Sequence, residues 1–325
     1  MEKEIRARII ATGSYIDDNF ISNDDLATVM DTNDEWIYQR TGIKTRSYSK
    51  INTSAMATKA AKKALEMAKL EANDIDYILV ATFTPDYNTP STANLIYKNL
   101  NMSNKAPALD INAGCSGLIY GLELASMLIH KYKRILVIGA EHISKHLNFN
   151  DRSTSILFGD GASALILEQS NEAGIIDSII KSESDNTQAI LGSNGINLQT
   201  PFTNIDFNQD RYVHMKGQEV FKFATKACKT SIQDIMKKNN ISSKEIDYVV
   251  LHQANQRIVD FAIKVLKMEV AKFPGNIEKY GNTSAASIGI VLDECNRKKM
   301  FKAKDKIILT AFGSGLTYGS VLLEW

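Results

Sequence analysis

The sequence is poor in cysteine and proline, with three cysteines and five prolines among 325 residues. Cys115, Cys228 and Cys295 include no closely spaced pair, which excludes a disulfide framework and argues against a zinc site. So few prolines, and no low-complexity stretch, leave no candidate for a long linker, because such linkers are biased in composition. We therefore expect a compact chain without a metal.

The sequence also lacks a charge bias and long apolar runs. Its formal net charge is +1, so no broad positive field attracts nucleic acid. No apolar run approaches the roughly 18 residues that suggest a membrane span. The first residues, MEKEIRARII, do not resemble a secretory signal. These absences predict a soluble, cytoplasmic protein that binds neither nucleic acid nor a membrane.

What the chain does contain is a stretch organised around Cys115. A short apolar run, Ala108 to Ile111, is followed by Asn-Ala-Gly-Cys, and apolar residues then recur at helical spacing. This pattern places Cys115 on a strand-to-helix turn, where free N–H groups and the helix dipole favour a thiolate. We expect a nucleophile; the alternative is a small buried hydrophobic residue.

The two halves of the chain resemble each other. The segments Ala57–Leu65 and Ala224–Ile232 are both helical in period, and each is followed by Ile-Asp-Tyr and an apolar run, at residues 75 and 246. Two generic helix–strand units are the alternative to a true duplication. An alternation of apolar strands and helices is typical of buried, largely parallel sheets covered by helices.

A similar offset recurs later in the chain. The apolar runs that begin at residues 135 and 307 are 172 residues apart, and so are Gly117 and Gly289. The pattern predicts an α/β fold of two stacked halves in five layers, each half ordered strand, helix, strand, helix, strand. The division is expected near residues 168–174, giving halves 1–170 and 171–325.

The second half supplies two candidate partners for Cys115. His252 ends an apolar run, and Asn282 precedes the small residues that begin a helix. Because catalytic groups gather at the carboxyl ends of parallel strands, pairing of the halves brings His252 towards Cys115. A packed or exposed turn residue remains the alternative for His252, and a helix N-cap for Asn282.

Two glycine-containing segments complete the pattern. Residues 310–319 lack the spacing and the following helix of a dinucleotide-binding loop, and their backbone N–H groups can instead form an oxyanion hole. Asp160-Gly161, before an apolar run, predicts a hairpin turn.

Six motifs occur along the chain: Asp31–Ile37 with Arg40–Ile43, Gly114–Gly117, Phe158–Gly161, His252–Asn255, Gly281–Ala286 and Ala311–Gly313. Through these motifs, in this order, the whole sequence resembles the β-ketoacyl-acyl-carrier-protein synthase III family of the thiolase superfamily. The resemblance implies the five-layered αβαβα thiolase fold and a homodimer. It also implies condensation of an acyl-CoA primer with malonyl-acyl-carrier protein, with release of carbon dioxide, to begin fatty acid synthesis.

The resemblance assigns a role to each candidate catalytic residue. Cys115 carries the acyl group, and the backbone N–H groups of Cys115 and Ser314 bind the tetrahedral oxyanion. His252 and Asn282 donate hydrogen bonds to the enolate that decarboxylation forms. No cofactor or metal is expected, because fixed donors stabilise both anions and acyl-CoA enters as a substrate.

The resemblance also implies a CoA site and a carrier-protein patch. Trp36 and Arg152 would hold the adenine between them, although Trp36 alone would be taken for a core aromatic residue. The other CoA-binding positions are Thr32 and Arg40 at the nucleotide, and Gly217, Phe221, Ala254 and Asn255 along the pantetheine tunnel. Lys222, Arg257 and Lys264 match the basic patch for the acidic carrier protein, although exposed lysines are usually only solvated.

Three positions depart from the family pattern. Gln218 stands where an Asn is common on the pantetheine path, which is a tolerable change. Gly114 stands where the family often has Ala, and we expect a looser turn there. Thr89 lies near the point where the dimer partner's loop often offers a Phe that closes the primer pocket. The smaller Thr89 predicts a pocket that is open to longer or bulkier primers.

Other functions compete with this interpretation. The order Cys, His, Asn is also that of papain-like proteases, but the expected sequence context around the cysteine is absent. A non-catalytic binding subunit would have lost Cys115, which this chain retains. The nearest alternative is a related acyltransferase or condensing enzyme of secondary metabolism. Two decarboxylation donors favour carbon–carbon bond formation but leave the pathway open.

Overall fold

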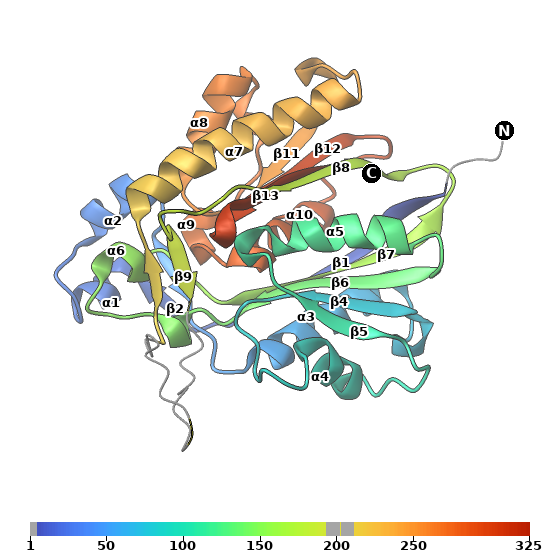
Figure 1. Cartoon of the computed structure of the whole chain (residues 1–325), viewed down its shortest axis with the longest axis horizontal. Helices are drawn as coiled ribbons and strands as arrows, with labels where there is room; N and C mark the ends of the chain where they lie inside the picture. The colour runs from blue at the N-terminus through green and yellow to red at the C-terminus, as the bar shows by residue number, and fades with distance from the viewer. Residues whose placement is uncertain (1–4, 193–201, 203–210) are drawn as a thin grey trace.

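The computed structural model describes residues 5–192, 202 and 211–325, and these form five layers (Figure 1). The first sheet contains β1 (Arg6–Tyr15), β4 (Tyr77–Ala81), β5 (Ala108–Ile111), β6 (Arg134–Glu141) and β7 (Gly161–Ser170), in the order β1-β7-β6-β4-β5. The second contains β8 (Gly174–Ser182), β11 (Tyr248–Leu251), β12 (Lys306–Gly313) and β13 (Thr317–Glu324), in the order β11-β12-β13-β8. The chain passes between the sheets at residues 171–173.

Helices fill the other three layers. The central layer contains α5 (Gly117–Leu128) and α10 (Ser287–Arg297), which lie between the two sheets in Figure 1. The outer layers are α3 (Thr53–Ala68) with α4 (Thr92–Asn99), and α7 (Gly217–Lys238) with α8 (Gln256–Leu266). The predicted five-layered α/β fold is therefore confirmed. Among the described residues, no helix has both the length and the apolar character that a bilayer span requires.

Short elements lie around the loops near one end of the sheets. They are β2 (Phe20–Ser22), α1 (Asn23–Ala27), α2 (Asp34–Thr41), β3 (Thr45–Ser47), α6 (Arg152–Ser155), β9 (Ile190–Gly192), β10 (Val213–Met215) and α9 (Ile277–Tyr280). The antiparallel pairs β2–β3 and β9–β10 form two small sheets of their own.

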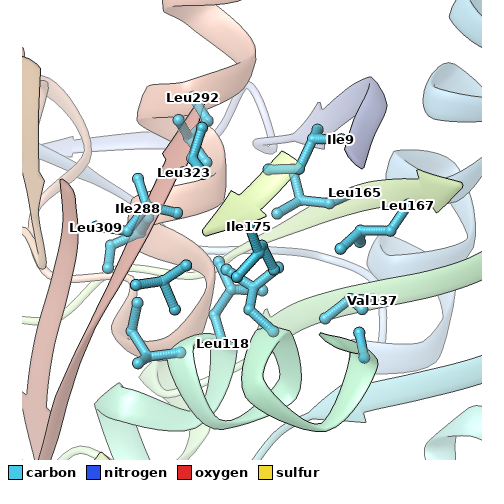
Figure 2. Close-up of a cluster of buried hydrophobic side chains, with 14 of the residues drawn as sticks. Ile9, Leu118, Val137, Leu165, Leu167, Ile175, Ile288, Leu292, Leu309 and Leu323 are labelled. Atoms are coloured by element: carbon cyan, nitrogen blue, oxygen red, sulfur yellow. The ribbon is translucent and has the colours of Figure 1, made fainter. Parts of the chain in front are cut away.

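An apolar core joins the two sheets through the central helices. Leu118 of α5 and Ile288 of α10 pack with Leu165 of the first sheet and Leu309 of the second (Figure 2). These side chains are almost completely buried, and burial of each contributes roughly 1.5–3 kcal/mol to the free energy of unfolding. The central helices are thereby held in place, and both begin at the same edge of the sheets.

The predicted duplication is visible in the strand pairing. Strand β4 pairs in parallel with β6, and β11 pairs in parallel with β12 in the corresponding register. In the second half β8, α7, β11, α8 and β12 follow the predicted order, with α9 and α10 added before β12. No strand there corresponds to β5 among the described residues. The 3₁₀ turn η5 (Val270–Lys272) and Pro274 occupy that place, and a proline has no N–H to give to a sheet.

The proposed match of Gly117 with Gly289 is wrong, by two residues. The 3₁₀ turns η2 (Gly114–Ser116) and η6 (Ser284–Ala286) begin 170 residues apart, and each runs directly into a central helix. Gly117 therefore corresponds to Ser287. The offset returns to 172 at β6 and β12 because the connection after α10 is longer than the one after α5.

Candidate active site

Cys115 lies on the predicted strand-to-helix turn. Strand β5 ends at Ile111, and the turn η2 places Cys115 immediately before helix α5. Gly114 has a φ of 52°, in the left-handed region that favours glycine, and its N–H donates to Oδ1 of Asn112 at 3.2 Å. This turn directs the Cys115 side chain into a cavity rather than into the core.

The second half builds the same turn around Asn282. Ser284 has a φ of 49°, and its N–H donates to Oδ1 of Asn282 at 2.9 Å, as Gly114 does to Asn112. This bond orients the Asn282 amide, because an oxygen that accepts it leaves the NH₂ group as the free donor. The duplication thus provides the nucleophile in one half and an amide donor in the other.

Cys115, His252 and Asn282 all line one cavity of about 800 Å³. They come from β5–η2, from the end of β11 and from the loop before η6, which meet where the sheets present their strand ends. Phe312 also lines this cavity and packs edge-on against His252, with ring centroids 5.2 Å apart. The predicted meeting of the three groups is therefore present in the geometry, and their roles remain predictions.

The environment of the Cys115 thiol differs from the sequence expectation. Burial raises the pKa of Cys115 to about 12, and the nearby Glu141 carboxyl also raises it. The Ser284 hydroxyl, whose oxygen lies 3.2 Å from Sγ, and the Cys115 N–H lower it only in part. The helix start alone thus does not make Cys115 a thiolate in the free protein, and the thiol must lose its proton during the reaction.

His252 is buried and uncharged. Burial lowers its pKa to about 3, so the imidazole is neutral at physiological pH. Nδ1 lies 2.7 Å from Oγ of Ser287, and that oxygen already accepts the N–H of Gln253 at 3.3 Å. We infer that the Ser287 hydroxyl donates its hydrogen to Nδ1, an arrangement that puts the ring proton on Nε2. A neutral ring with Nε2–H is a hydrogen-bond donor.

The candidate oxyanion donors lie where two glycines meet. A Cβ on Gly313 would come within 2.6 Å of the Cys115 nitrogen, and a Cβ on Gly114 within 2.9 Å of the Ser314 nitrogen. Neither N–H donates to a backbone carbonyl of another element among the described residues. The absence of side chains at both glycines leaves these two donors accessible from the cavity.

The predicted CoA positions lie mostly along the same cavity. Its lining includes Trp36, Arg40, Gly217, Phe221, Ala254 and Asn255, together with the divergent Gln218. Asn255 also caps helix α8, because its side chain accepts the N–H of Arg257 and donates to the Arg40 carbonyl. Thr32 does not line the cavity, and its Oγ1 is buried without a hydrogen-bond partner.

The proposed adenine clamp is closed. The guanidinium of Arg152 lies 4.8 Å from the centroid of the Trp36 ring, and that of Arg40 lies 4.4 Å from it. A base held between Trp36 and Arg152 needs a gap of roughly 7 Å, which is two van der Waals contacts. The adenine thus fits only if Arg152 moves away from Trp36 and releases its contacts with Asp31.

The three residues of the proposed carrier-protein patch are exposed on α7 and α8. Arg257 lines the cavity and lies over the ring of Phe221, at 5.3 Å, whereas Lys222 and Lys264 are exposed and do not line it. None of the three forms an ion pair within the described part of the chain. The patch therefore borders the cavity with charge that is available to a partner.

Sequence reasoning missed three polar residues behind the site. Ser284 contacts Cys115, and Ser287 contacts His252. Glu141 lies on the other side of Ser284 from Cys115. Glu141 ends an apolar strand, and a carboxylate at such a place was a usable signal. The two serines carried no signal beyond their place in a small-residue helix start.

A second cavity, of about 1050 Å³, borders the first and shares Phe83, Asn112, Gly192 and Val213 with it.

Comparisons with known proteins agree with this geometry. The family model described as 3-oxoacyl-[acyl-carrier-protein] synthase III matches residues 109–184, and the model of its C-terminal part matches residues 236–325. Proteins named β-ketoacyl-[acyl-carrier-protein] synthase III are 46% identical in Clostridium kluyveri, over 98% of this chain and 99% of that protein, and in Clostridium botulinum, over 98% of both.

Solved structures of condensing enzymes also resemble this chain over nearly its whole length. The chain is 39% identical to 3-oxoacyl-[acyl-carrier-protein] synthase III of Aquifex aeolicus, with a TM-score of 0.91 over 98% of this chain and 100% of that chain. It is 26% identical to the priming β-ketosynthase of the R1128 polyketide pathway, with a TM-score of 0.89 over 100% and 98%. Both likenesses extend over nearly the whole of each chain.

Proposed function

The chain belongs to the 3-oxoacyl-[acyl-carrier-protein] synthase III family, and we propose that the three groups meeting in its cavity carry out the family's reaction. It is an acyltransferase of the condensing type, which starts fatty acid synthesis by joining an acyl primer to a malonyl unit. The observation that carries the assignment of roles is that Cys115, His252 and Asn282 line one cavity from separate elements.

In the first step, the Cys115 sulfur attacks the thioester carbon of the acyl-CoA. The oxygen becomes an anion and accepts hydrogen bonds from the N–H groups of Cys115 and Ser314. Each donor of this kind typically contributes about 10²–10³ in rate. Collapse of this intermediate expels the CoA thiolate and leaves the acyl group on Cys115.

In the second step, the malonyl thioester loses carbon dioxide and its carbonyl oxygen becomes an enolate. Nε2–H of His252 and the NH₂ group of Asn282 donate to that oxygen, and neither donor needs to change its charge. The carbanion then attacks the acyl thioester and releases Cys115. These steps use fixed donors for both anions, so the proposal includes no metal or other cofactor.

Intact-mass measurement with a panel of acyl-CoAs tests this assignment. Cys115→Ser should lose the acyl adduct. His252→Ala and Asn282→Ala should keep the adduct and lose release of carbon dioxide from the malonyl thioester. Equal loss of both steps in the last two variants would contradict the division of roles.

The acidic carrier protein is proposed to dock on the patch formed by Lys222, Arg257 and Lys264. The patch borders the cavity, so a carrier bound there could deliver its malonyl group to Cys115. Lys264→Glu should raise the KM for malonyl-carrier protein without slowing acylation by acyl-CoA. Lys62→Glu, the same change on helix α3 in the opposite outer layer, is the matched control and should change neither.

A homodimer is proposed from the edge of the first sheet. Strand β5 pairs only with β4 among the described residues, and Leu109 on it is 37% exposed. A second copy of this strand can pair with the open edge. Sedimentation should show a dimer that Leu109→Lys weakens.

We also place the protein in the cytoplasm, because a reactive Cys115 must remain a free thiol.

A further inference from the structure

A buried carboxyl group lies behind the nucleophile and takes no part in the steps above. Glu141 ends β6 and has no exposed surface. Oε2 accepts hydrogen bonds from the hydroxyls of Thr84, at 2.5 Å, and Thr82, at 3.3 Å, and also the N–H of Phe83 at 3.3 Å. Burial raises the pKa of Glu141 to about 8, although these hydrogen bonds oppose the shift. The group therefore titrates close to physiological pH.

Ser284 connects this carboxyl group to the nucleophile. Its Oγ lies 3.2 Å from Sγ of Cys115 and 3.4 Å from Oε1 of Glu141. The Ser284 backbone is fixed by the Asn282 side chain, and the residue is completely buried. A hydroxyl has a single hydrogen, so Ser284 can donate to only one of these two neighbours at a time.

Charge repulsion makes the two end groups interdependent. A thiolate at Cys115 and a carboxylate at Glu141 would place two negative charges in one buried site, linked through a single hydroxyl. Like charges in such a site disfavour each other, so the pair holds one negative charge more readily than two. A proton that leaves Cys115 is therefore best accepted by Glu141.

The fold itself does not require these two residues. By the offsets of the two halves, Ser284 corresponds to Gly114 and Glu141 corresponds to Gly313. The equivalent pair in the other half thus consists of two glycines: Gly114, which faces Ser314, and Gly313, which faces Cys115. Ser284 and Glu141 thus form a polar connection at positions where the other half carries no side chains.

We propose that Glu141 stores the Cys115 proton during the reaction cycle and that Ser284 transfers it. As sulfur attacks the thioester, the thiol proton passes to Oγ of Ser284 while the Ser284 hydrogen passes to Oε1 of Glu141. The thiol and carboxylate become an acyl thioester and a carboxylic acid, and the CoA thiolate takes a proton from water. When condensation releases the Cys115 thiolate, the proton returns by the same route and restores the starting state.

This inference rests on the proposed role of Cys115 and is tested by single-turnover acylation. The wild-type protein is mixed with a four-carbon acyl-CoA between pH 6 and 9, and the adduct is weighed over time. Glu141→Gln keeps the shape and most hydrogen bonds but cannot accept the proton, so acylation should slow by roughly 10²-fold. Ser284→Gly suits the left-handed backbone and should slow it similarly.

The pH profile separates proton storage from a structural role. Wild-type acylation should rise as Glu141 ionises, near pH 8, and Glu141→Gln should lose this rise. The ionisable groups that sense the Glu141 charge are Cys115 and Lys145, and both remain in the variant. Thr82→Val, which removes a hydroxyl from the same carboxyl group but leaves the relay intact, should change the rate less than about threefold.

Carbon dioxide release provides the second readout. Glu141→Gln that has been fully acylated should release carbon dioxide from the malonyl thioester at the wild-type rate, because His252 and Asn282 are untouched. The proposal would be overturned if Glu141→Gln became acylated at the wild-type rate or kept the wild-type pH profile. It would also be overturned if the variant slowed acylation and carbon dioxide release equally. Retention of the adduct by Cys115→Ser would instead overturn the assignment of the nucleophile.

Discussion

A Cβ atom built on Gly114 would lie 2.3 Å from Oγ of Ser314. Gly114 precedes the nucleophile, and Ser314 supplies one of the two proposed oxyanion donors. The turn η2 and the end of β12 are thus so close that these two positions cannot both carry side chains without movement. Both the φ of 52° at position 114 and the serine that faces it across this contact favour a glycine there.

Gly114→Ala should therefore impair acylation in this chain. The new methyl group would push Ser314 away, and the loss of one oxyanion donor costs up to about 10²–10³ in rate. Gly114→Ala/Ser314→Gly removes the facing hydroxyl and should recover at least part of the acylation rate. Single-turnover acylation of the two single variants and the double variant measures the coupling. Additive effects would show that the contact does not limit the reaction.

Ser287→Ala should weaken the second step. The variant lacks the Ser287 hydroxyl, so Nδ1 of His252 loses the partner that keeps the ring proton on Nε2. A hydrogen bond of this kind contributes about 1 kcal/mol, so we expect carbon dioxide release to slow roughly five- to tenfold. Acylation of Cys115, measured by intact mass, should stay within about twofold of the wild-type rate. Equal slowing of both steps would indicate a general distortion of the cavity.

Burial of His252 should make folding stability sensitive to acid. Its pKa is lowered to about 3 in the folded protein from the usual 6.5, so the unfolded chain binds more protons between these values. The free energy of unfolding must then fall as the pH falls from 6.5 towards 3. Denaturant unfolding at pH 7.5, 5.5 and 4.5 should show a larger loss for the wild type than for His252→Gln. Equal losses of the free energy of unfolding in the two proteins would contradict a buried neutral imidazole at position 252.

Local periodicity predicted the elements that carry the site. The apolar spacing after Cys115 predicted a helix, and α5 spans Gly117–Leu128. By contrast, the predicted hairpin turn at Asp160-Gly161 is wrong. The Asp160 carboxylate is buried and accepts the N–H groups of Ser49 and Ser144, which lie far apart in the sequence. A turn preference describes only a few neighbouring residues and does not reveal such contacts.

The chemistry of Cys115 was predictable only in part. Its place before a helix followed from the apolar pattern, but the pKa of its thiol depends on how deeply the site is buried. It also depends on Ser284, which is 169 residues away in the sequence. The sequence thus indicated which residues meet, whereas the desolvation and the connection to Glu141 required the three-dimensional arrangement.

The size of the residue at position 89 should control which primers are accepted. Thr89 lines the second cavity, which adjoins the cavity of Cys115 at Phe83 and Asn112. In the proposed dimer, a small residue on this loop leaves room for the end of a long acyl chain. Thr89→Phe should fill that room and lower acylation by an eight-carbon acyl-CoA roughly tenfold, relative to acetyl-CoA.

Competition between acetyl-CoA and four-, six- and eight-carbon acyl-CoAs, read out by the mass of the adduct, measures this preference directly. Thr89→Ser, which keeps the side chain small, is the matched control and should retain the wild-type preference. Because no group near Cys115 changes, the rate with acetyl-CoA should stay nearly constant in both variants. A wild-type protein that processes acetyl-CoA far better than the longer primers would show that another residue closes the pocket.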